Sequence, residues 1–470
     1  MTQAAVEKTR IDRSSLHALI ILAVGALFAI GVAREWNPLA GNRAWTDWVW
    51  TWRDLGIFKT AGLCLPSFLL IAWVLWREDR AAPPPLVPRL WLALLLLALA
   101  NYLLQVLGML ADPRGIDLVR QIVSSSVATS YFTDAAAIQR PLEWLSHFQD
   151  AALNLHSMTH PPGPILFYYV FLRLFAPGPA ALAGGCAVGL LASAGTGMMY
   201  AFTGLWTKDR RTRLTASAFY ALLPALTVFF PEFDQIYPIF SMLLIFCWVK
   251  ALDAESPSIY AFYAGSILFA ATFLAYNLLS IGIFLLYFCA YYLWRSTWSG
   301  TALSRVVRAL VSAAATCAGI YLALWLATGY HPLAAFREAL SNQAKLQRRS
   351  YLPFPFWDPY DFLLGSGILA LPVILLHLQR VWRERRLGRR DSTRADAALT
   401  VIGLATILTI DVSGALRAET TRVWIFLQPL LIAPVALELS RFPRNWRFAI
   451  FALQWWILAC VKAKMTFIDP

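Results

Sequence analysis

Apolar runs long enough to cross a lipid bilayer recur along this chain from Ser15 to Val461, and they constrain its fold more than any other feature. Hydrophobic residues make up 59% of the 470 positions and charged residues 14%. Because a helix needs about 17 to 25 apolar residues to span a bilayer, the sequence predicts an all-α, polytopic transmembrane helical bundle. A soluble fold is excluded.

The apolar runs predict about thirteen spans. They are expected near residues 15–33, 56–76, 90–110, 180–206, 214–230, 235–252, 258–275, 277–294, 306–328, 362–378, 397–414, 421–439 and 448–461. The net charge of +13 lies mainly in short loops, where the positive-inside rule explains it, so no nucleic-acid partner is expected.

If the N-terminus is cytoplasmic, the predicted spans place all five basic loops on the cytoplasmic side of the membrane. These loops are 77–89, 207–213, 295–308, 379–396 and 441–447. The loop 34–55 then lies outside, and its tryptophans, Trp36, Trp45, Trp48, Trp50 and Trp52, are expected to form an interfacial belt. The protein is predicted to reside in a plasma membrane, specifically a bacterial inner membrane, with its long loops on the periplasmic side.

We divide the chain into two parts. Residues 1–89 are predicted to be a cytoplasmic tail with two additional transmembrane helices, and residues 90–470 a catalytic core with long external loops at 111–178 and 329–361. The apolar segment 163–176 is too short for a typical span, so we expect a juxtamembrane or re-entrant helix there. The six cysteines all lie in apolar runs, and none forms a CxxC pair, which indicates neither disulfides nor a thiolate zinc site.

The first long external loop gathers acids and histidines. They are Asp134, Glu143, His147, Asp150, His156 and His160. A carboxylate at the membrane surface can act as a general base if a substrate hydroxyl comes within hydrogen-bond reach. The alternative for any one of these acids is an ordinary solvated loop charge.

His160 opens the tetrapeptide HPPG. Its two prolines remove two amide donors and hold His160 away from helical geometry, which presents the imidazole at a defined place. A divalent metal (Mg, Mn or Zn) bound by Asp134, His156 and His160 is an alternative that the sequence leaves open and does not require.

The motifs YFTDAA, HPPG, LRLFAPGP and LWTKDRRTRLTASAFYALLPAL follow one another between residues 131 and 226. In this order they resemble the GT-C glycosyltransferases, most closely the branch of protein O-mannosyltransferases and lipid A aminoarabinose transferases. The resemblance implies a GT-C-like fold with external juxtamembrane helices, and it assigns the role of catalytic base to Asp134. A second acid of that family corresponds to Glu232 or Asp234, which would orient the acceptor or hold a metal; a simple carboxylate at a helix end is the alternative. Gly163 departs from the leucine that is usual there.

The second long external loop mixes cations with aromatic side chains. Its cations are Arg337, Lys345, Arg348 and Arg349, and its aromatic residues are Tyr351, Phe354, Phe356, Trp357 and Tyr360. Guanidinium groups pair with phosphate and aromatic rings line lipid and sugar faces, so this loop fits a polyprenyl-phosphate donor. An amphipathic surface helix that contacts the headgroups of membrane lipids is the alternative.

A short external turn carries Glu419 and Arg422 beside an apolar run. Because charge at the membrane boundary is costly, we expect the two residues to pair and to face a cavity; a snorkelling Arg422 is the alternative.

Together these features predict an inverting hexosyl- or pentosyltransferase. It would move a monosaccharide from a polyprenyl-phosphate donor to a hydroxyl of a glycan, lipid or protein at the external membrane face. Asp134 is the predicted base. The predicted donor-binding residues are His160, Arg348, Arg349, Glu419 and Arg422, with Glu143, His156, Asp234, Lys345 and Trp357 as secondary candidates. The alternative interpretation is a transporter or flippase of a lipid-linked saccharide.

Overall fold

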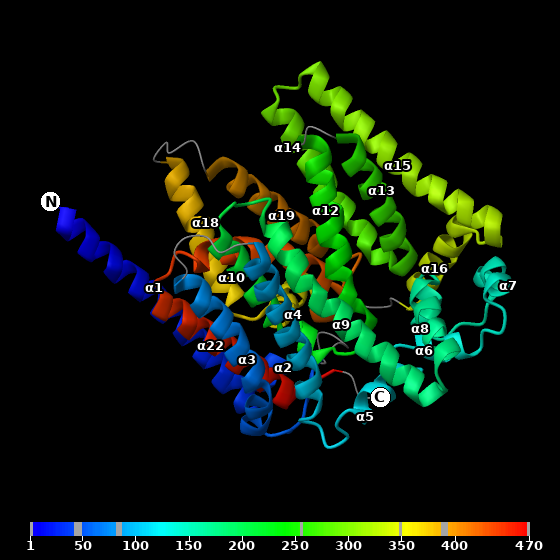
Figure 1. The fold of residues 1–470 in the computed structure, drawn as a ribbon, viewed down its shortest axis with the longest axis horizontal. Helices are drawn as coiled ribbons and strands as arrows, with labels where there is room; N and C mark the ends of the chain where they lie inside the picture. Colours follow the sequence, from blue (N-terminus) through cyan, green and yellow to red (C-terminus); the bar gives the residue numbers. More distant parts are fainter. Residues whose placement is uncertain are drawn as a thin grey trace.

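The computed structural model describes residues 3–41, 49–80, 87–253, 257–346, 350–386 and 393–467. The prediction of an all-α polytopic fold is confirmed (Figure 1). The described strands are β1 (Thr51–Trp52) and β2 (Met465–Thr466), which pair antiparallel with Thr51 opposite Thr466. This short pairing ties the loop after the first helix to the end of the last one.

The longer helices are α1 (Gln3–Ala33), α3 (Ile57–Arg80), α4 (Val87–Met109), α9 (Pro177–Thr203), α12 (Tyr237–Asp253), α13 (Pro257–Leu274), α15 (Gly300–Thr328), α18 (Ala370–Arg386), α19 (Thr393–Ser413) and α22 (Arg444–Lys464). The shorter α-helices are α2 (Asn37–Ala40), α5 (Asp117–Ser124), α6 (Tyr131–Ala136), α7 (Pro141–Ser146), α8 (Gly163–Leu174), α10 (Arg210–Ala221), α11 (Pro224–Val228), α14 (Gly282–Arg295), α16 (Pro332–Leu346), α17 (Phe354–Ser366), α20 (Thr420–Val423) and α21 (Gln428–Leu439). The 3₁₀ turns are η1 (Phe148–Asp150), η2 (Ser157–Thr159), η3 (Phe233–Ile236), η4 (Tyr276–Ile281) and η5 (Ile425–Leu427).

In the described part of the chain, seven helices are long and apolar enough to cross a membrane, or eight if the bent pair α17–α18 is one span. Three of the predicted spans are broken. The span at 214–230 divides into α10 and α11 ahead of Pro224, since a residue before proline disfavours helical geometry. The span at 362–378 bends by 101° after Gly367, which adopts a φ of +86°. The span at 421–439 consists of α20, η5 and α21.

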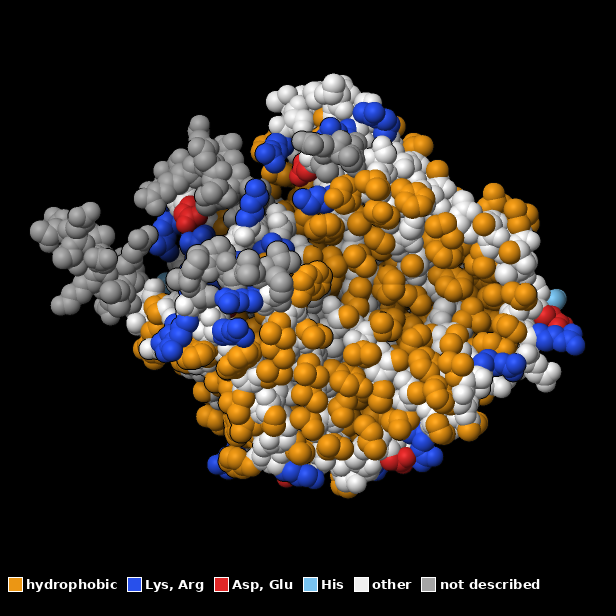
Figure 2. Space-filling view, in the orientation of Figure 1, with side chains coloured by type: hydrophobic (Ala, Val, Ile, Leu, Met, Phe, Trp, Pro, Cys, Tyr) orange, Lys and Arg blue, Asp and Glu red, His pale blue; other side chains and the backbone are white. Residues whose placement is uncertain are grey.

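Ion pairs join the predicted cytoplasmic loops to one another. Arg210 lies 2.6 Å from Glu78, and Asp79 pairs with both Arg211 and Arg447. At the other end, the amide of Asn342 in α16 donates to the carbonyl of Met158 in η2, which joins the two long external loops. Loops predicted to share a side therefore contact each other; which end faces outward stays a prediction. Figure 2 shows a broad apolar surface between margins that carry Lys and Arg.

The helices of residues 1–89 pack closely on the rest of the bundle: α1 and α3 lie against α22, and α3 also lies against α4 (Figure 1). The boundary at residue 89 stays a prediction. The expected tryptophan belt is wrong for Trp50, which is only 3% exposed, whereas Trp36 is 46% exposed. Trp50 is buried because its indole N–H donates to Asp361 of α17 over 2.8 Å. Trp45 and Trp48 lie outside the described residues.

Candidate functional site

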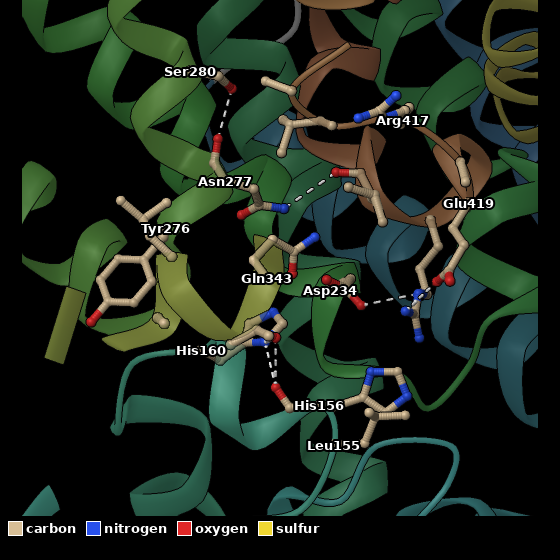
Figure 3. A pocket seen from close by; sticks show the side chains of 18 of the residues that line it. Leu155, His156, His160, Asp234, Tyr276, Asn277, Ser280, Gln343, Arg417 and Glu419 are labelled. Atoms are coloured by element: carbon tan, nitrogen blue, oxygen red, sulfur yellow. Dashed lines mark hydrogen bonds and ion pairs between the residues drawn. The ribbon is translucent and has the colours of Figure 1, made fainter. Parts of the chain in front are cut away.

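A cavity of about 590 Å³ opens where the predicted external segments meet. Its polar and ionisable lining side chains include Thr129, Tyr131, His156, Thr159, His160, Glu232, Asp234, Tyr276, Asn277, Ser280, Gln343, Arg417, Glu419 and Arg422. Its apolar lining includes Leu155, Leu279, Phe336, Leu340, Leu416 and Val423. Figure 3 shows Asp234, Glu419 and His156 around this space, although they come from three separate segments of the chain. The volume is in the range of small-molecule sites.

Arg422 lies among three carboxylates of the cavity. Its Nη2 is 2.5 Å from Glu419 Oε2, its Nη1 is 3.7 Å from Glu232 Oε2, and its Nε is 3.6 Å from Asp234 Oδ2. Its side chain is only 12% exposed. A buried charge is tolerated when it is paired, so the three carboxylates stabilise the charge of Arg422 in this largely buried position.

Glu232 is the most deeply buried of these carboxylates, at 1% exposed. Its Oε1 has no hydrogen-bond partner in the described structure. Burial raises the pKa of Glu232 to about 8, against the opposing pull of Arg422, and the negative charges of Asp234 and Glu419 raise it further. A carboxyl group with a pKa near neutrality can accept or release a proton at working pH.

The two histidines of the cavity are both held by backbone carbonyls. His160 donates from Nδ1 to the carbonyl of His156 over 2.8 Å, and His156 donates from Nε2 to the carbonyl of Val127 over 2.8 Å. Because a carbonyl only accepts, each ring keeps its other nitrogen as an acceptor. Burial lowers the pKa of His156 to about 4 and also lowers the pKa of His160. Both rings are therefore neutral at physiological pH.

Gly163, the last residue of HPPG, packs closely against the backbone of α13. A Cβ at this position would lie 2.3 Å from the carbonyl oxygen of Phe273, at the end of α13. Only glycine lets α8 begin against that backbone, so the replacement of leucine in this motif has a steric cause. The two prolines before it leave His160 extended, with a φ of −119° and a ψ of 157°.

Asp134, the predicted base, is not among the residues that line this cavity. It lies in α6 and is 6% exposed. Its Oδ1 accepts a 2.6 Å hydrogen bond from the side-chain amide of Asn154, whose backbone N–H also approaches the carboxylate. In this arrangement Asp134 connects two parts of the first long loop. Its role as the base stays a prediction.

Three other predicted site residues, Glu143, Lys345 and Trp357, are not among the residues that line the cavity. Glu143 is exposed and pairs with Arg140 at 3.3 Å. Lys345 is exposed and donates to Asn342, one turn earlier on α16. Trp357 packs on Tyr360 with ring centroids 5.0 Å apart. Arg348 and Arg349 lie outside the described residues.

Several lining residues were not predicted. Tyr131 precedes the acid of YFTDAA, and Asn277 is a polar residue at the start of an apolar run. The side-chain amide of Asn277 donates to the carbonyl of Val423 over 3.3 Å, next to Arg422. Arg417 shares a turn with Glu419. A polar residue inside an apolar run was the one sequence signal available for Asn277.

Among the described residues, no group of three or more His, Cys, Asp or Glu side chains has the geometry of a metal site. Asp134, His156 and His160, the residues considered as metal ligands, therefore do not form one.

No protein-family model matches this chain. No curated protein matches it either. Among solved structures, it is similar to a crystal structure of the Archaeoglobus fulgidus oligosaccharyltransferase in complex with Zn and sulfate, at 14% sequence identity and a TM-score of 0.49. The match covers 79% of this chain and 52% of that one, so this chain spans about half the length of the archaeal protein.

Proposed function

We propose that this protein is a membrane glycosyltransferase that takes a monosaccharide from a polyprenyl-phosphate donor and transfers it to a hydroxyl acceptor at the external face. One observation carries the proposal: the cavity combines a buried cluster of one arginine and three carboxylates with an apolar wall. A lipid-linked sugar phosphate likewise has a charged part, the phosphate, and an apolar part, the prenyl chain. Its prenyl chain would lie along Leu279, Leu340 and Phe336, and its sugar phosphate near Arg417 and Arg422.

Glu232 is the proposed general base. It removes the proton of the acceptor hydroxyl, which attacks the anomeric carbon as the bond from that carbon to the phosphate oxygen breaks. The electron pair of the broken bond leaves with the lipid phosphate, so no general acid is required. Asp234 and Glu419 hold Arg422 in place, and the guanidinium groups stabilise the departing phosphate.

The test is transfer of radiolabelled sugar from polyprenyl-phosphate donors to a membrane extract by purified protein in reconstituted vesicles. Wild type, Glu232→Gln and Asp134→Asn are compared at equal folded protein. We expect product from wild type, and a loss of about 10²-fold to 10⁴-fold in Glu232→Gln. If Asp134→Asn loses activity while Glu232→Gln keeps it, Asp134 is the base. If wild type consumes no donor but moves lipid-linked sugar across the bilayer, the flippase reading replaces this proposal.

A further inference from the structure

The turn that carries Arg422 has an unusual backbone. Ala418 and Glu419 adopt φ angles of +70° and +57°, in the left-handed region that residues other than glycine rarely occupy. Such a conformation persists only when the surrounding structure imposes it. The groups that impose it here come from α17.

Two buried aspartates of α17 hold this turn. Asp358 accepts a hydrogen bond from the backbone N–H of Ala418 over 3.1 Å, and its carbonyl accepts one from the Thr420 hydroxyl over 2.7 Å. Asp361 is fully buried, and its Oδ2 accepts from the backbone N–H of Thr421 over 2.9 Å and from the Thr420 hydroxyl over 3.2 Å. Arg422 follows directly in the chain, so its backbone position depends on these bonds.

The other carboxylate oxygen of Asp361 also binds a third segment of the chain. Oδ1 accepts from the Thr421 hydroxyl and from the indole N–H of Trp50, each over 2.8 Å. Trp50 belongs to the loop between α1 and α3, more than 300 positions away in the chain, and packs edge-on against Phe229 and Phe467. The Trp50 indole N–H and the Thr421 backbone N–H can only donate, so each carboxylate oxygen of Asp361 faces one obligate donor, and an asparagine amide nitrogen in either place would face a donor.

We propose that Asp361 is a positioning residue for the candidate site, and that the N-terminal segment completes it through Trp50. Asp361 fixes Thr420 and Thr421, these fix the strained turn, and the turn fixes Glu419 and Arg422 within the carboxylate cluster. The helices of residues 1–89 are then part of the enzyme's working structure. This inference rests on the proposed function for its catalytic meaning, while the linkage from Trp50 to the turn is a structural property that can be measured separately.

The test uses the full-length protein and two matched pairs of variants. Trp50→Phe keeps an aromatic ring but removes the N–H; Trp52→Phe is its control, because the Trp52 indole N–H has no hydrogen-bond partner in the described structure. Thr421→Val removes the hydroxyl at nearly constant shape, and its control, Thr421→Ser, keeps the hydroxyl. Hydrogen–deuterium exchange of residues 415–424 is measured beside sugar transfer.

We expect faster exchange in residues 415–424 and a tenfold to hundredfold lower kcat, of the order produced by small misplacements of catalytic groups, for Trp50→Phe and Thr421→Val. Trp52→Phe and Thr421→Ser should resemble wild type in both measurements. Unchanged exchange and transfer in Trp50→Phe would overturn the inference. If wild type itself transfers no sugar from any donor, the proposed function fails, and the exchange rates alone decide whether Trp50 holds the turn.

Discussion

Arg422 and Glu232 show how burial changes the chemistry of single residues in this protein. Glu232 lies 190 positions before Arg422, yet their charged groups are 3.7 Å apart in a largely buried space, where only 2% of the Glu232 side chain and 12% of the Arg422 side chain is exposed. In such a space a carboxyl group loses much of the hydration that favours its ionised form, which is why its pKa rises despite the nearby arginine. The same effect keeps His156 and His160 neutral.

The raised pKa of Glu232 predicts the pH dependence of transfer. A general base works only when ionised, so the rate should fall as pH drops below about 8 and level off above it. At pH 6 the wild-type rate should be about a hundredth of the plateau, since each pH unit below the pKa lowers the ionised fraction about tenfold. Initial rates of transfer between pH 5.5 and 9.5 measure this.

Glu232→Gln should lower the rate and remove this pH dependence. Glu143→Gln is the matched control, because Glu143 is exposed and paired with Arg140 away from the cavity, and it should keep the wild-type profile. A Glu232→Gln variant with the wild-type profile would show that another group titrates.

At the scale of elements, glycines decide where helices of this bundle can touch. The start of α8 lies on the backbone of α13 at Gly163, and α9 brings Gly189 against Phe230, where an added Cβ would lie 2.5 Å from the ring. Gly197, on the same helix α9, has open space beside it. Gly163 and Gly189 lie where neighbouring atoms leave no room for a side chain. At Gly197 there is room, so glycine there only lowers the stability of the helix.

Gly163→Ala should lower the free energy of unfolding by about 1–3 kcal/mol, because the new methyl group overlaps the Phe273 carbonyl. It should also lower sugar transfer, since His160 lies three residues before this contact. Gly197→Ala should be neutral or stabilising by up to about 1 kcal/mol, as expected for alanine in a helix. Thermal unfolding in detergent compares the two; equal destabilisation by both would contradict the steric explanation.

At the scale of the whole molecule, the ion pairs among loops 77–80, 207–213 and 441–447 gather one set of basic segments at one end of the bundle. The candidate cavity lies among the other set of segments. The positive-inside rule then predicts a cytoplasmic basic end and an external cavity.

Single cysteines test this orientation. Glu143→Cys and Lys208→Cys both replace exposed residues, in a background without the six native cysteines. In intact cells a membrane-impermeant maleimide should label Glu143→Cys, and it should label Lys208→Cys only after the membrane is permeabilised. The opposite pattern would place the cavity inside the cell.

The class of fold could be predicted from the sequence, because the length of an apolar run and the charge of a loop are local properties that a bilayer acts on directly. It also singled out Glu419 and Arg422, since charge beside an apolar run is costly enough to need a cause, and His160, since the two prolines after it restrict its backbone. Glu232 and Asp234 were named from the family resemblance. Which of these residues meet depends on long-range packing. Glu232 and Asp234 reach Arg422 across the bundle, whereas Asp134 bonds to Asn154 instead of lining the cavity. The burial of Trp50 was decided there as well, because its partner Asp361 lies in α17, and no local pattern reports a contact over that separation.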